Sequence, residues 1–333
     1  MNENQLHYKV SVALCTHNGQ AHFQDQLDSI LAQSASVHEI NIFDDASDPA
    51  FRKIIKEQIE KNNILFPNIA IHSEFNNPAL GVAKNFEAAI QNCTGDLIFL
   101  ADQDDIWVPN KVETICQFFQ DNSDKSLVFT DAQLVDEMAL PLKKTLFETL
   151  YISKSEINEV LTNRGIHTLA RRNIVTGATV AMRKELRAAA GAIPDGWIHD
   201  EWYAMVAAVR GQLGLISDSL IKYRQHGANQ IGVRSLSLKG KLGRLKVSRT
   251  QWNARLLRRA HSLESWVSTS GYSEDEVQSI VAREKVIHEI VRNQYPGSRL
   301  RRIIPVFNET KTGRYKSCGL GIQDIARDLI QPV

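Results

Sequence analysis

Residues 97–111, LIFLADQDDIWVPNK, decide how the first half of the chain is interpreted. The first five residues are apolar, and a short apolar run that ends at a polar turn is typical of a buried strand. Three carboxylates follow at once, at Asp102, Asp104 and Asp105. Grouped carboxylates repel one another unless a positive charge lies among them, and hard cations such as Mg²⁺ or Mn²⁺ accept such oxygen ligands. The turn therefore predicts a metal site that shares its cation with a diphosphate, or else a solvated acidic loop.

Upstream of this stretch, apolar runs alternate with amphipathic segments. The apolar runs are YKVSVALC (8–15), EINIF (39–43) and NIAIHSE (68–74), and the amphipathic segments are AHFQDQLDSILAQ (21–33), FRKIIKEQIEK (51–61) and GVAKNFEAAIQN (81–92). Regular alternation of strand and helix predicts an α/β fold with a mostly parallel central sheet and helices on both faces. Ligands of such sheets bind beyond the carboxyl ends of the strands. The residues that follow each apolar run are therefore the candidates for chemistry.

Polar groups follow the first two predicted strands as well. In THNG, Thr16 and Asn18 are able to contact a ligand or simply to form a turn. Asp44 and Asp45 follow the second strand, where a carboxylate can accept a hydrogen bond from a nucleobase N–H or a ribose hydroxyl. An Asx turn or a helix cap is the alternative, and Asp48 before a proline favours it.

The second half of the chain is less regular. Candidate strands are SLVFTDAQLV (126–135), GATVAMRK (177–184) and DSLIKYR (218–224), and DEWYAMVAAVRG (200–211) is a candidate helix. Residues 136–175 carry no readable pattern. We find no internal repeat.

Two further clusters contain side chains that are suited to chemistry. His199, Asp200 and Glu201 precede the apolar helix, and adjacent helical side chains point in different directions, so the three do not all face one pocket. A zinc-binding HExxH pattern is absent. Asp200 is therefore a candidate general base, and capping of the helix is the alternative. Further on, Arg224 and His226 follow a strand, and a histidine there could bind phosphate, complete a metal shell or serve a structural role.

Composition limits the class of protein. The chain has 333 residues, 43% of them hydrophobic and 23% charged, with a net charge of +1. This length exceeds the roughly 100–200 residues that usually form one domain core, so we expect either a large domain with an appendage or two domains. The four cysteines are scattered without CxxC spacing, which favours a reducing cytoplasm. No run approaches the roughly 18 apolar residues of a membrane span, and the amino terminus lacks a signal-peptide core.

The charge pattern changes near residue 232. Residues 219–263 contain no Asp or Glu, whereas Lys and Arg accumulate at Lys239, Lys241, Arg244, Lys246, Arg249, Arg255, Arg258 and Arg259. We predict that 233–333 form a basic, mainly helical region. No nucleic-acid-binding motif accompanies these charges, so we do not expect a nucleic acid partner. Within 234–259, leucines and Trp252 interleave with the cations, which predicts either peripheral attachment to an anionic membrane surface or a solvated helical face.

Six of these segments occur in a recognisable order over residues 8–232: VALCTHNG, FDDASD, NPALGVAKNF, LADQDDIWVPNK, GWIHDEW and YRQHGANQIG. In this order they resemble the inverting family 2 glycosyltransferases, which have the A-type fold that binds nucleotide-diphospho-sugars. The branch with the strongest resemblance is that of the bacterial rhamnosyltransferase-like enzymes of surface polysaccharide synthesis. The resemblance implies a glycosyltransferase domain at 1–232, with the nucleotide-sugar side at about 8–125 and the acceptor side at about 126–232.

The resemblance also implies roles for individual residues. The donor nucleotide would be bound by Thr16, His17, Asn18, Asp45, Lys84, Asp102 and Asp104. Mg²⁺ or Mn²⁺ would be held by Asp104, Asp105 and His226, although the choice among the three aspartates of the turn stays open. Asp200 would be the general base. The acceptor and phosphate side would include His199, Trp202 and Arg224.

The implied partners are a nucleotide-diphosphate sugar and a glycan or lipid-linked glycan acceptor, with dTDP-rhamnose as the expected donor. The implied location is cytoplasmic, with peripheral attachment at the inner face of the cytoplasmic membrane. One alternative is a nucleotidyltransferase, but that class usually carries a glycine- and lysine-rich loop after its first strand, and THNGQAHF lacks one. Another is an inactive glycan-binding or scaffold protein, which would be expected to lose Asp200 or the acidic turn. The oligomeric state is not predicted.

Overall fold

The computed structural model describes residues 8–225 and 248–332, and it divides them into two units. The sheet unit contains the described residues up to Ile157, together with Val175–Ile193 and the part from Ile198 to residue 225. The helical unit contains Asn158–Ile174, Pro194–Trp197 and residues 248–332. Two stretches from the middle of the chain, 158–174 and 194–197, therefore pack with the C-terminal helices.

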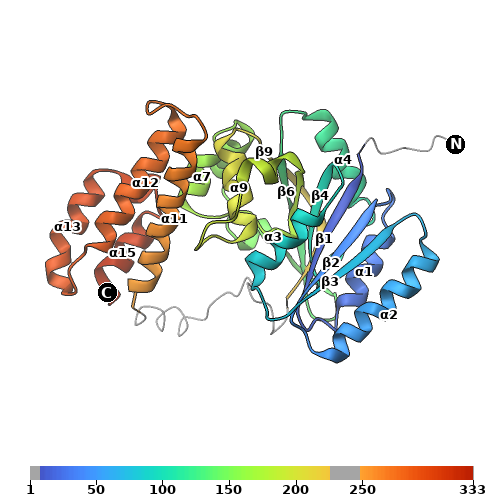
Figure 1. Cartoon of the computed structure of the whole chain (residues 1–333). Helices are drawn as coiled ribbons and strands as arrows, with labels where there is room; N and C mark the ends of the chain where they lie inside the picture. Colours follow the sequence, from blue (N-terminus) through green and yellow to red (C-terminus); the bar gives the residue numbers. More distant parts are fainter. Residues whose placement is uncertain (1–7, 226–247, 333) are drawn as a thin grey trace. The chain divides into compact units, whose positions relative to one another are not determined.

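The predicted strands form one mixed sheet in the sheet unit (Figure 1). The strands are β1 (Val10–Thr16), β2 (Glu39–Asp45), β3 (Ala70–Asn76), β4 (Leu97–Asp102), β5 (Ile106–Trp107), β6 (Leu127–Val135), β7 (Pro141–Thr145), β8 (Val180–Arg183) and β9 (Leu213–Arg224). Their order is β3-β2-β1-β4-β8-β6-β9-β5, and β7 pairs with β6. The first four strands are mutually parallel, β8 is antiparallel to β4 and β6, and β9 runs parallel to β6. The predicted α/β fold with a mostly parallel sheet is confirmed.

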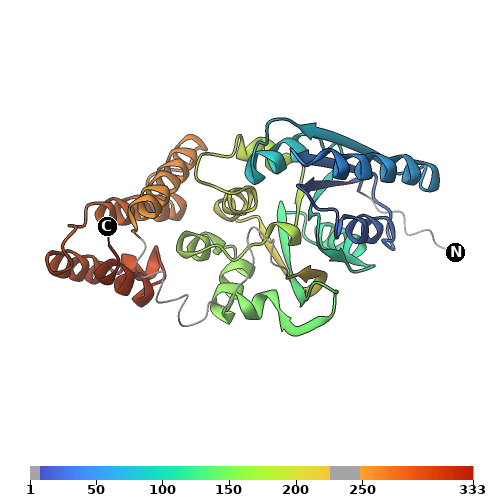
Figure 2. The same ribbon diagram turned by 90° about the horizontal axis from the view of Figure 1, so that it is seen from below.

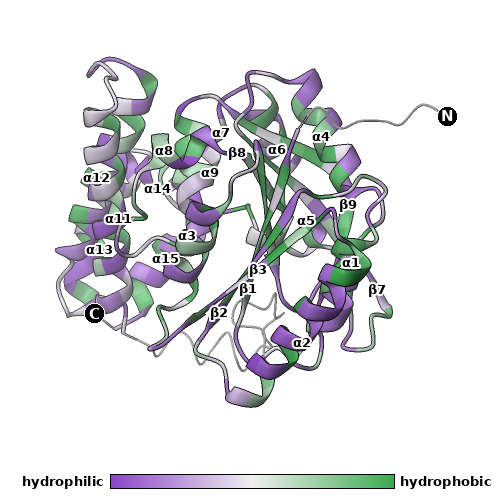
Figure 3. Ribbon diagram, turned by 45° about the vertical axis from the view of Figure 1, so that its right-hand side comes forward, coloured by the Kyte–Doolittle hydropathy of each residue, from purple (hydrophilic) through white to green (hydrophobic). Residues whose placement is uncertain are grey.

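Helices flank this sheet. They are α1 (Phe23–Leu31), α2 (Pro49–Leu65), α3 (Val82–Asn92), α4 (Lys111–Asp121), α5 (Leu146–Thr149), α8 (Glu185–Ala190) and α9 (His199–Val209), with a 3-10 turn, η1 (Gly177–Thr179); α6 (Lys154–Leu161) begins in this unit. α3 packs against β1 and β2, and α2 lies beside β3 (Figures 1 and 2). β1 and β2 are buried along their whole length because helices cover both faces. Figure 3 accordingly shows long hydrophobic stretches on the central strands and mixed colours on helices such as α2.

The parallel register fixes the functional edge of the sheet. Thr16 pairs with Asp44 across β1 and β2, and Cys15 pairs with Asp102 across β1 and β4. The polar residues that follow these strands therefore meet at one edge. The cap expected at Asp48 is also present, because its Oδ1 accepts the backbone N–H of Phe51 (2.8 Å) at the start of α2.

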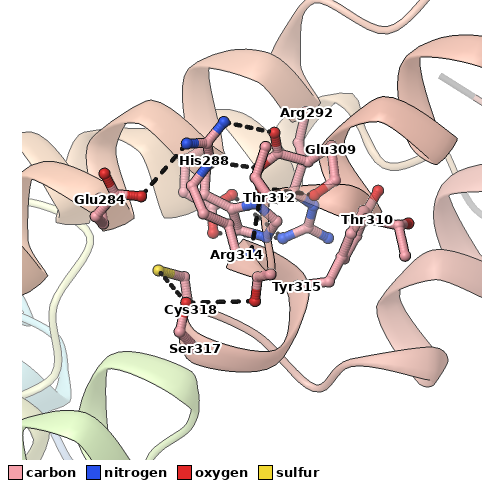
Figure 4. A network of polar contacts seen from close by, with 12 residues as sticks. Glu284, His288, Arg292, Glu309, Thr310, Thr312, Arg314, Tyr315, Ser317 and Cys318 are labelled. Atoms are coloured by element: carbon pink, nitrogen blue, oxygen red, sulfur yellow. Dashed lines mark hydrogen bonds and ion pairs between the residues drawn. The ribbon is translucent and has the colours of Figure 1, made fainter.

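The helical unit is built from α7 (Gly165–Arg171), α11 (Thr250–Thr269), α12 (Val277–Asn293), α13 (Arg299–Lys311), α14 (Arg314–Ser317) and α15 (Ile322–Ile330). The predicted helical C-terminal region is thus confirmed. Its interior contains a small apolar cluster of Tyr295, Val306 and Tyr315, alongside many buried charged groups. Figure 4 shows part of this ionic core, in which His288 Nδ1 lies 2.6 Å from Glu309 Oε1 and Arg314 donates to both oxygens of Glu309 (2.8 and 2.9 Å).

Several cations in the described part of the basic segment contact other residues of the helical unit. Arg249 forms a buried ion pair with Asp328. The Arg255 Nε donates to the carbonyl oxygen of Gly196 (2.9 Å), and the Arg259 guanidinium lies 4.1 Å from the ring centroid of Trp197. The rest of the predicted membrane-binding segment, at 234–247, lies outside the described residues. Among the residues described, none of the helices is long and apolar enough to span a bilayer.

Candidate active site

The acidic turn lies at the carboxyl end of β4. Asp102 is the last residue of the strand and is partly buried, whereas Asp105 is only 1% exposed. The Asp105 Oδ1 accepts the backbone N–H of Arg224 (3.0 Å), and the Asp105 Oδ2 is buried without a hydrogen-bond partner in the described part of the chain. A buried carboxylate oxygen without a donor is costly, so the turn has capacity for a further positive group.

Electrostatics bring Asp200 into the same site. Burial, together with the nearby charges of Asp104 and Asp200, raises the pKa of Asp102 to about 7. Burial likewise raises the pKa of Asp105 well above its ordinary value, again with contributions from Asp104 and Asp102. Carboxylates from β4, the turn and the start of α9 thus form one region of excess negative charge.

Lys111 is a buried cation of this region that was not among the predicted site residues. It begins α4, has no exposed surface, donates from Nζ to the carbonyl oxygen of Ala178 (3.0 Å), and lies 4.0 Å from the ring centroid of Trp107. Burial lowers its pKa to about 7, although Asp105 and Asp102 oppose the shift. The sequence indicated the burial of Lys111 only through the apolar Val112 that follows it at the end of residues 97–111.

Arg224 braces the backbone of the turn. Its side chain is 2% exposed, and its Nε donates to the carbonyl oxygen of Asp104 (2.8 Å). Its two terminal nitrogens donate to the carbonyl oxygen of Glu137 (2.6 Å) and to Asp25 Oδ2 (2.9 Å). The guanidinium is therefore held by protein groups, and its predicted contact with phosphate remains a prediction.

The loop after β1 is joined to the acidic turn by Gln103. Its Oε1 accepts the backbone N–H of His17 (2.7 Å), and its Nε2 donates to the carbonyl oxygen of the same residue (3.0 Å). Gly19 allows this approach, because a Cβ there would lie 2.1 Å from the Gln103 Oε1. Asn18 is also fixed, since its N–H donates to Ser47 Oγ (2.8 Å) and its Oδ1 accepts the N–H of Asp48 (2.9 Å).

The two aspartates after β2 have different partners. Asp44 accepts from Thr16 Oγ1 (3.1 Å) and from Arg52 Nε (2.9 Å). Asp45 accepts the backbone N–H groups of Leu80 (2.7 Å) and Gly81 (2.9 Å), at the start of α3. Both carboxylates therefore stabilise loops at this edge.

Lys84 lies in the first turn of α3. It donates to Glu87 (2.7 Å) and to the carbonyl oxygen of Ile193 (3.3 Å), and neither of these contacts involves the acidic turn.

His199 and Asp200 begin α9, where the helix dipole favours the charged form of a carboxylate. His199 is buried, its ring stacks on Phe86 with centroids 3.9 Å apart, and its nitrogens have no hydrogen-bond partner in the described part of the chain. Burial lowers its pKa to about 3, so the ring is neutral near pH 7. A Cβ at Gly177 would lie 2.8 Å from His199 Nε2 and 3.6 Å from Asp200 Oδ2, so a glycine is needed there.

The structure thus gathers most of the predicted site residues at one edge, in two connected groups. The first is the loop after β1 with Gln103, and the second is the acidic turn with Asp200, Lys111 and Arg224. Trp202 is 1% exposed and donates from Nε1 to the carbonyl oxygen of Ala190 (3.1 Å), so it packs inside the unit. The predicted metal ligand His226 lies outside the described residues.

The residues of the turn fit a divalent cation. The uncompensated negative charge and the unpartnered oxygen of Asp105 both favour a hard positive ion with oxygen ligands. Within the described residues, no group of three or more His, Cys, Asp or Glu side chains is arranged to hold a metal. We therefore expect a cation bound here to take further ligands from a substrate or solvent, as Mg²⁺ commonly does.

Comparisons with known proteins agree with this geometry. A family model described as Glycosyl transferase family 2 matches residues 11–181, just over half of the chain. An uncharacterised glycosyltransferase of Nostoc sp. is 24% identical over 66% of this chain and 66% of its own length. The dTDP-rhamnosyl transferase RfbG of Shigella flexneri is 26% identical over 72% of this chain and 80% of its own length. The chain spans slightly less than two thirds of the length of the first of these relatives.

Solved structures share the fold. S. aureus TarS, residues 1–349 with UDP-GlcNAc, superposes with a TM-score of 0.57 at 15% identity, over 93% of this chain and 89% of that one. The mannosyltransferase PcManGT of Pyrobaculum calidifontis, with GDP-Man and Mn²⁺, gives a TM-score of 0.53 at 16% identity, over 93% and 77%. With the family match and this shared architecture, the chain belongs to glycosyl transferase family 2 and has the A-type fold.

Proposed function

We propose that this chain is an inverting transferase that moves L-rhamnose from dTDP-rhamnose to a hydroxyl group of a growing surface polysaccharide or lipid-linked glycan. The observation that carries the proposal is the electrostatic proximity of Asp200 to the acidic turn, since Asp104 and Asp200 both raise the pKa of Asp102. One carboxylate base beside a cation-binding turn is the set that a single displacement needs. The choice of rhamnose is supported by the similarity to RfbG over most of both chains.

In the proposed reaction, Asp200 takes the proton of the acceptor hydroxyl. The acceptor oxygen then bonds to the anomeric carbon as the bond from that carbon to the diphosphate oxygen breaks, and the nucleoside diphosphate leaves with the electron pair. Asp104, with Asp102 or Asp105, would hold Mg²⁺ or Mn²⁺, which neutralises charge on the diphosphate when bound. Asp45 and the loop of Thr16, His17 and Asn18 would bind the nucleoside.

Lys111 and Arg224 act in this scheme through the acidic turn. Lys111 offsets part of the negative charge, because Asp105 and Asp102 favour its charged form and partly oppose the lowering of its pKa by burial. Arg224 fixes the backbone at Asp104 and Asp105. Pre-organised carboxylates of this kind bind a substrate without spending free energy on ordering the turn.

The test is a donor screen with purified protein. Release of nucleoside diphosphate is measured with dTDP-rhamnose, UDP-GlcNAc and GDP-mannose, each with Mn²⁺, with Mg²⁺ and with EDTA. We expect turnover of dTDP-rhamnose that depends on the divalent cation. Turnover of UDP-GlcNAc or GDP-mannose instead would overturn the choice of sugar, and cation-dependent turnover of none would overturn the proposal.

Variants assign the roles. Asp200→Asn should lower turnover by about 10²–10⁴-fold with donor affinity unchanged, as expected for loss of a general base. Asp104→Ala should weaken binding of the donor and of Mn²⁺, measured by calorimetry. Glu201→Gln is the matched control, because the neighbouring side chain leaves α9 in another direction. Equal losses in Glu201→Gln and Asp200→Asn would argue against Asp200 as the base.

A further inference from the structure

The outward face of α13 is apolar and exposed. Leu300, Ile303, Ile304 and Phe307 follow the spacing i, i+3, i+4, i+7, which places them on one side of a helix. Each is between 52% and 79% exposed. The opposite side of the same helix is buried through Arg302, Val306 and Glu309. A continuous exposed stripe of this kind marks an interaction surface more often than chance, because most surfaces scatter their apolar residues singly.

The exposed charged residues next to this stripe along the chain are positive. Between residues 294 and 321 the only acidic residue is Glu309, which is buried and paired with Arg314. Arg299 and Arg301 are exposed, and the helical period places them about 100° to either side of Leu300. Lys311 lies one turn beyond Phe307, with its Nζ 4.4 Å from the Phe307 ring centroid. Cations therefore border the apolar stripe on both flanks and at its C-terminal end.

We propose that this α13 face, defined by Leu300, Ile303, Ile304 and Phe307 with their flanking cations, docks on an anionic lipid surface. A helix with this pattern lies in the plane of a membrane, with its apolar side chains at the boundary between headgroups and acyl chains. Arg and Lys extend their stems along the apolar layer and place their charges at the lipid phosphates. The inference concerns attachment and does not rest on the donor or the reaction proposed above.

Charge complementarity favours a membrane over other occupants. A second copy of the chain, packed through a two-fold contact on this face, would bring Arg299 and Arg301 close to their counterparts, which repel. A nucleic acid would contact the cations but leave the central apolar stripe against phosphates. The segment 234–259 was predicted from sequence to bind lipids. In its described part, Arg249, Arg255 and Arg259 contact other residues of the helical unit, so we expect these three side chains to contribute less to lipid binding.

Vesicle flotation with the full chain tests the proposal. We expect the protein to float with vesicles of phosphatidylcholine and phosphatidylglycerol at low salt, and to stay behind with phosphatidylcholine alone. The variant Leu300→Glu/Ile304→Glu/Phe307→Glu should lower the bound fraction at least about tenfold. It removes the apolar side chains that enter the lipid and adds negative charges that the anionic surface repels. Arg299→Glu/Arg301→Glu should weaken binding and reduce its dependence on salt. No binding of the wild type to either vesicle would overturn the proposal.

Two controls locate the effect. Ile64→Glu/Leu65→Glu removes equally exposed apolar residues at the end of α2 and should leave flotation unchanged. Lys241→Glu/Lys246→Glu tests the basic segment by itself. If that variant abolishes flotation while the α13 variants bind as wild type does, the α13 face is not the docking surface. A concentration-dependent dimer in light scattering, lost in the α13 apolar variant, would likewise replace lipid with a second copy.

A site-specific probe gives an independent readout. All four native cysteines are buried, so Ile304→Cys can be labelled selectively with a fluorophore that responds to polarity. Its emission should shift to shorter wavelength when vesicles containing phosphatidylglycerol are added, and the same label at Ile64→Cys should show no shift. No shift at residue 304 while the protein floats would place the docking surface elsewhere and overturn the proposal.

Discussion

The sheet edge around Asp102 and the core of the C-terminal helices both keep carboxylates away from water, but their charges are balanced differently. In the helical unit, burial alone would raise the pKa of Glu289, yet Lys285 and Arg292 lower it below its ordinary value. At the sheet edge, burial and neighbouring carboxylates together raise the pKa of Asp102 to about 7, and the opposing effect of Lys111 is too small to reverse the shift.

The two regions differ in whether the fold itself satisfies its buried carboxylates. In the helical core, Asp328 meets Arg249, Arg292 and the Tyr315 hydroxyl, so its carboxylate is satisfied by the protein itself. At the sheet edge, the Asp105 Oδ2 stays without a donor among the described residues. A buried charge that the fold leaves uncompensated is stabilised when a ligand of opposite sign binds, and such groups gather at functional sites.

The strongest test of the comparison is Arg292→Met in α12. Arg292 donates to Asp328 (2.8 Å) and to Glu289 (3.3 Å), and all three are buried. Asp328 then keeps Arg249 and Glu289 keeps Lys285, but the buried network loses the cation that the two carboxylates share, so we expect a loss of about 3–5 kcal/mol in the stability of the helical unit. Hydrogen–deuterium exchange should show the loss in peptides from α12 and α15, with little change in peptides from β1 and β4.

Arg283→Met is the matched control on the same helix. Arg283 pairs with Glu274 at 3.6 Å, and both side chains are largely exposed. A surface pair of this kind contributes at most about 1 kcal/mol. If Arg283→Met and Arg292→Met cost the same, burial would not be what distinguishes the ionic core.

Lys111→Met should have a smaller effect in the sheet unit. The variant leaves the carbonyl oxygen of Ala178 without its donor, which costs about 1–3 kcal/mol. The carboxylates limit further loss because Asp102 can take up a proton near pH 7. Chemical denaturation at pH 7 with EDTA measures the loss, and adding Mn²⁺ with a nucleoside diphosphate should restore part of it. The exposed Lys53→Met serves as control, and a loss that the ligand leaves unchanged would contradict the idea of uncompensated charge.

The sheet could be predicted from sequence because its strands are continuous apolar runs. Residues such as Ile98, Phe99 and Leu100 are fully buried between helices, so the sequence shows a signal that does not depend on distant partners. The positions of Asp102 and Asp45 followed from the rule that polar residues gather at the carboxyl ends of parallel strands. β7 and α7, within 136–175, escaped prediction because short elements carry too little periodicity.

The helical core could not be predicted for a physical reason. Arg292, Arg302 and Glu309 face inward, and a sequence reading assigns such residues to the solvent side because charged groups are seldom fully buried. Their burial depends on partners far along the chain, such as Asp328 for Arg292. Arg224 was missed as a brace for the same reason, since its contacts to Asp25 and Asp104 are invisible without the fold.

The smallest effect that we predict is on the pH dependence of stability, and its sign distinguishes the sheet edge from the helical core. The folded-state pKa of Asp102 is raised to about 7 from an unfolded value of about 3.9, so its contribution to stability is fully present below about pH 4 and is lost as the pH rises toward 7. The pKa of Glu309 is lowered, because His288 and Arg314 outweigh its burial. Its contribution is present above an unfolded value of about 4.3 and is lost as the pH falls through the folded value.

Between pH 5 and 7 without metal, the contribution of Asp102 to the stability of the sheet unit should therefore fall as the pH rises, while Glu309 keeps its contribution to the helical unit. His199 acts in the opposite direction, because its pKa is lowered to about 3, so the effect of Asp102 is measured as the difference between wild type and Asp102→Asn. Asp102→Asn should flatten this dependence and raise the melting temperature of the sheet unit at pH 7 by about 2–4 °C, the shift that ~1 kcal/mol produces in a unit of this size. The exposed Asp218→Asn should change neither quantity. Lys111 does not obscure the result, because its pKa is lowered to about 7 from about 10.4, so it changes stability mainly above this pH window. A lower melting temperature in Asp102→Asn at pH 7 would mean that the edge already compensates its own charge, and the contrast between the two units would fail.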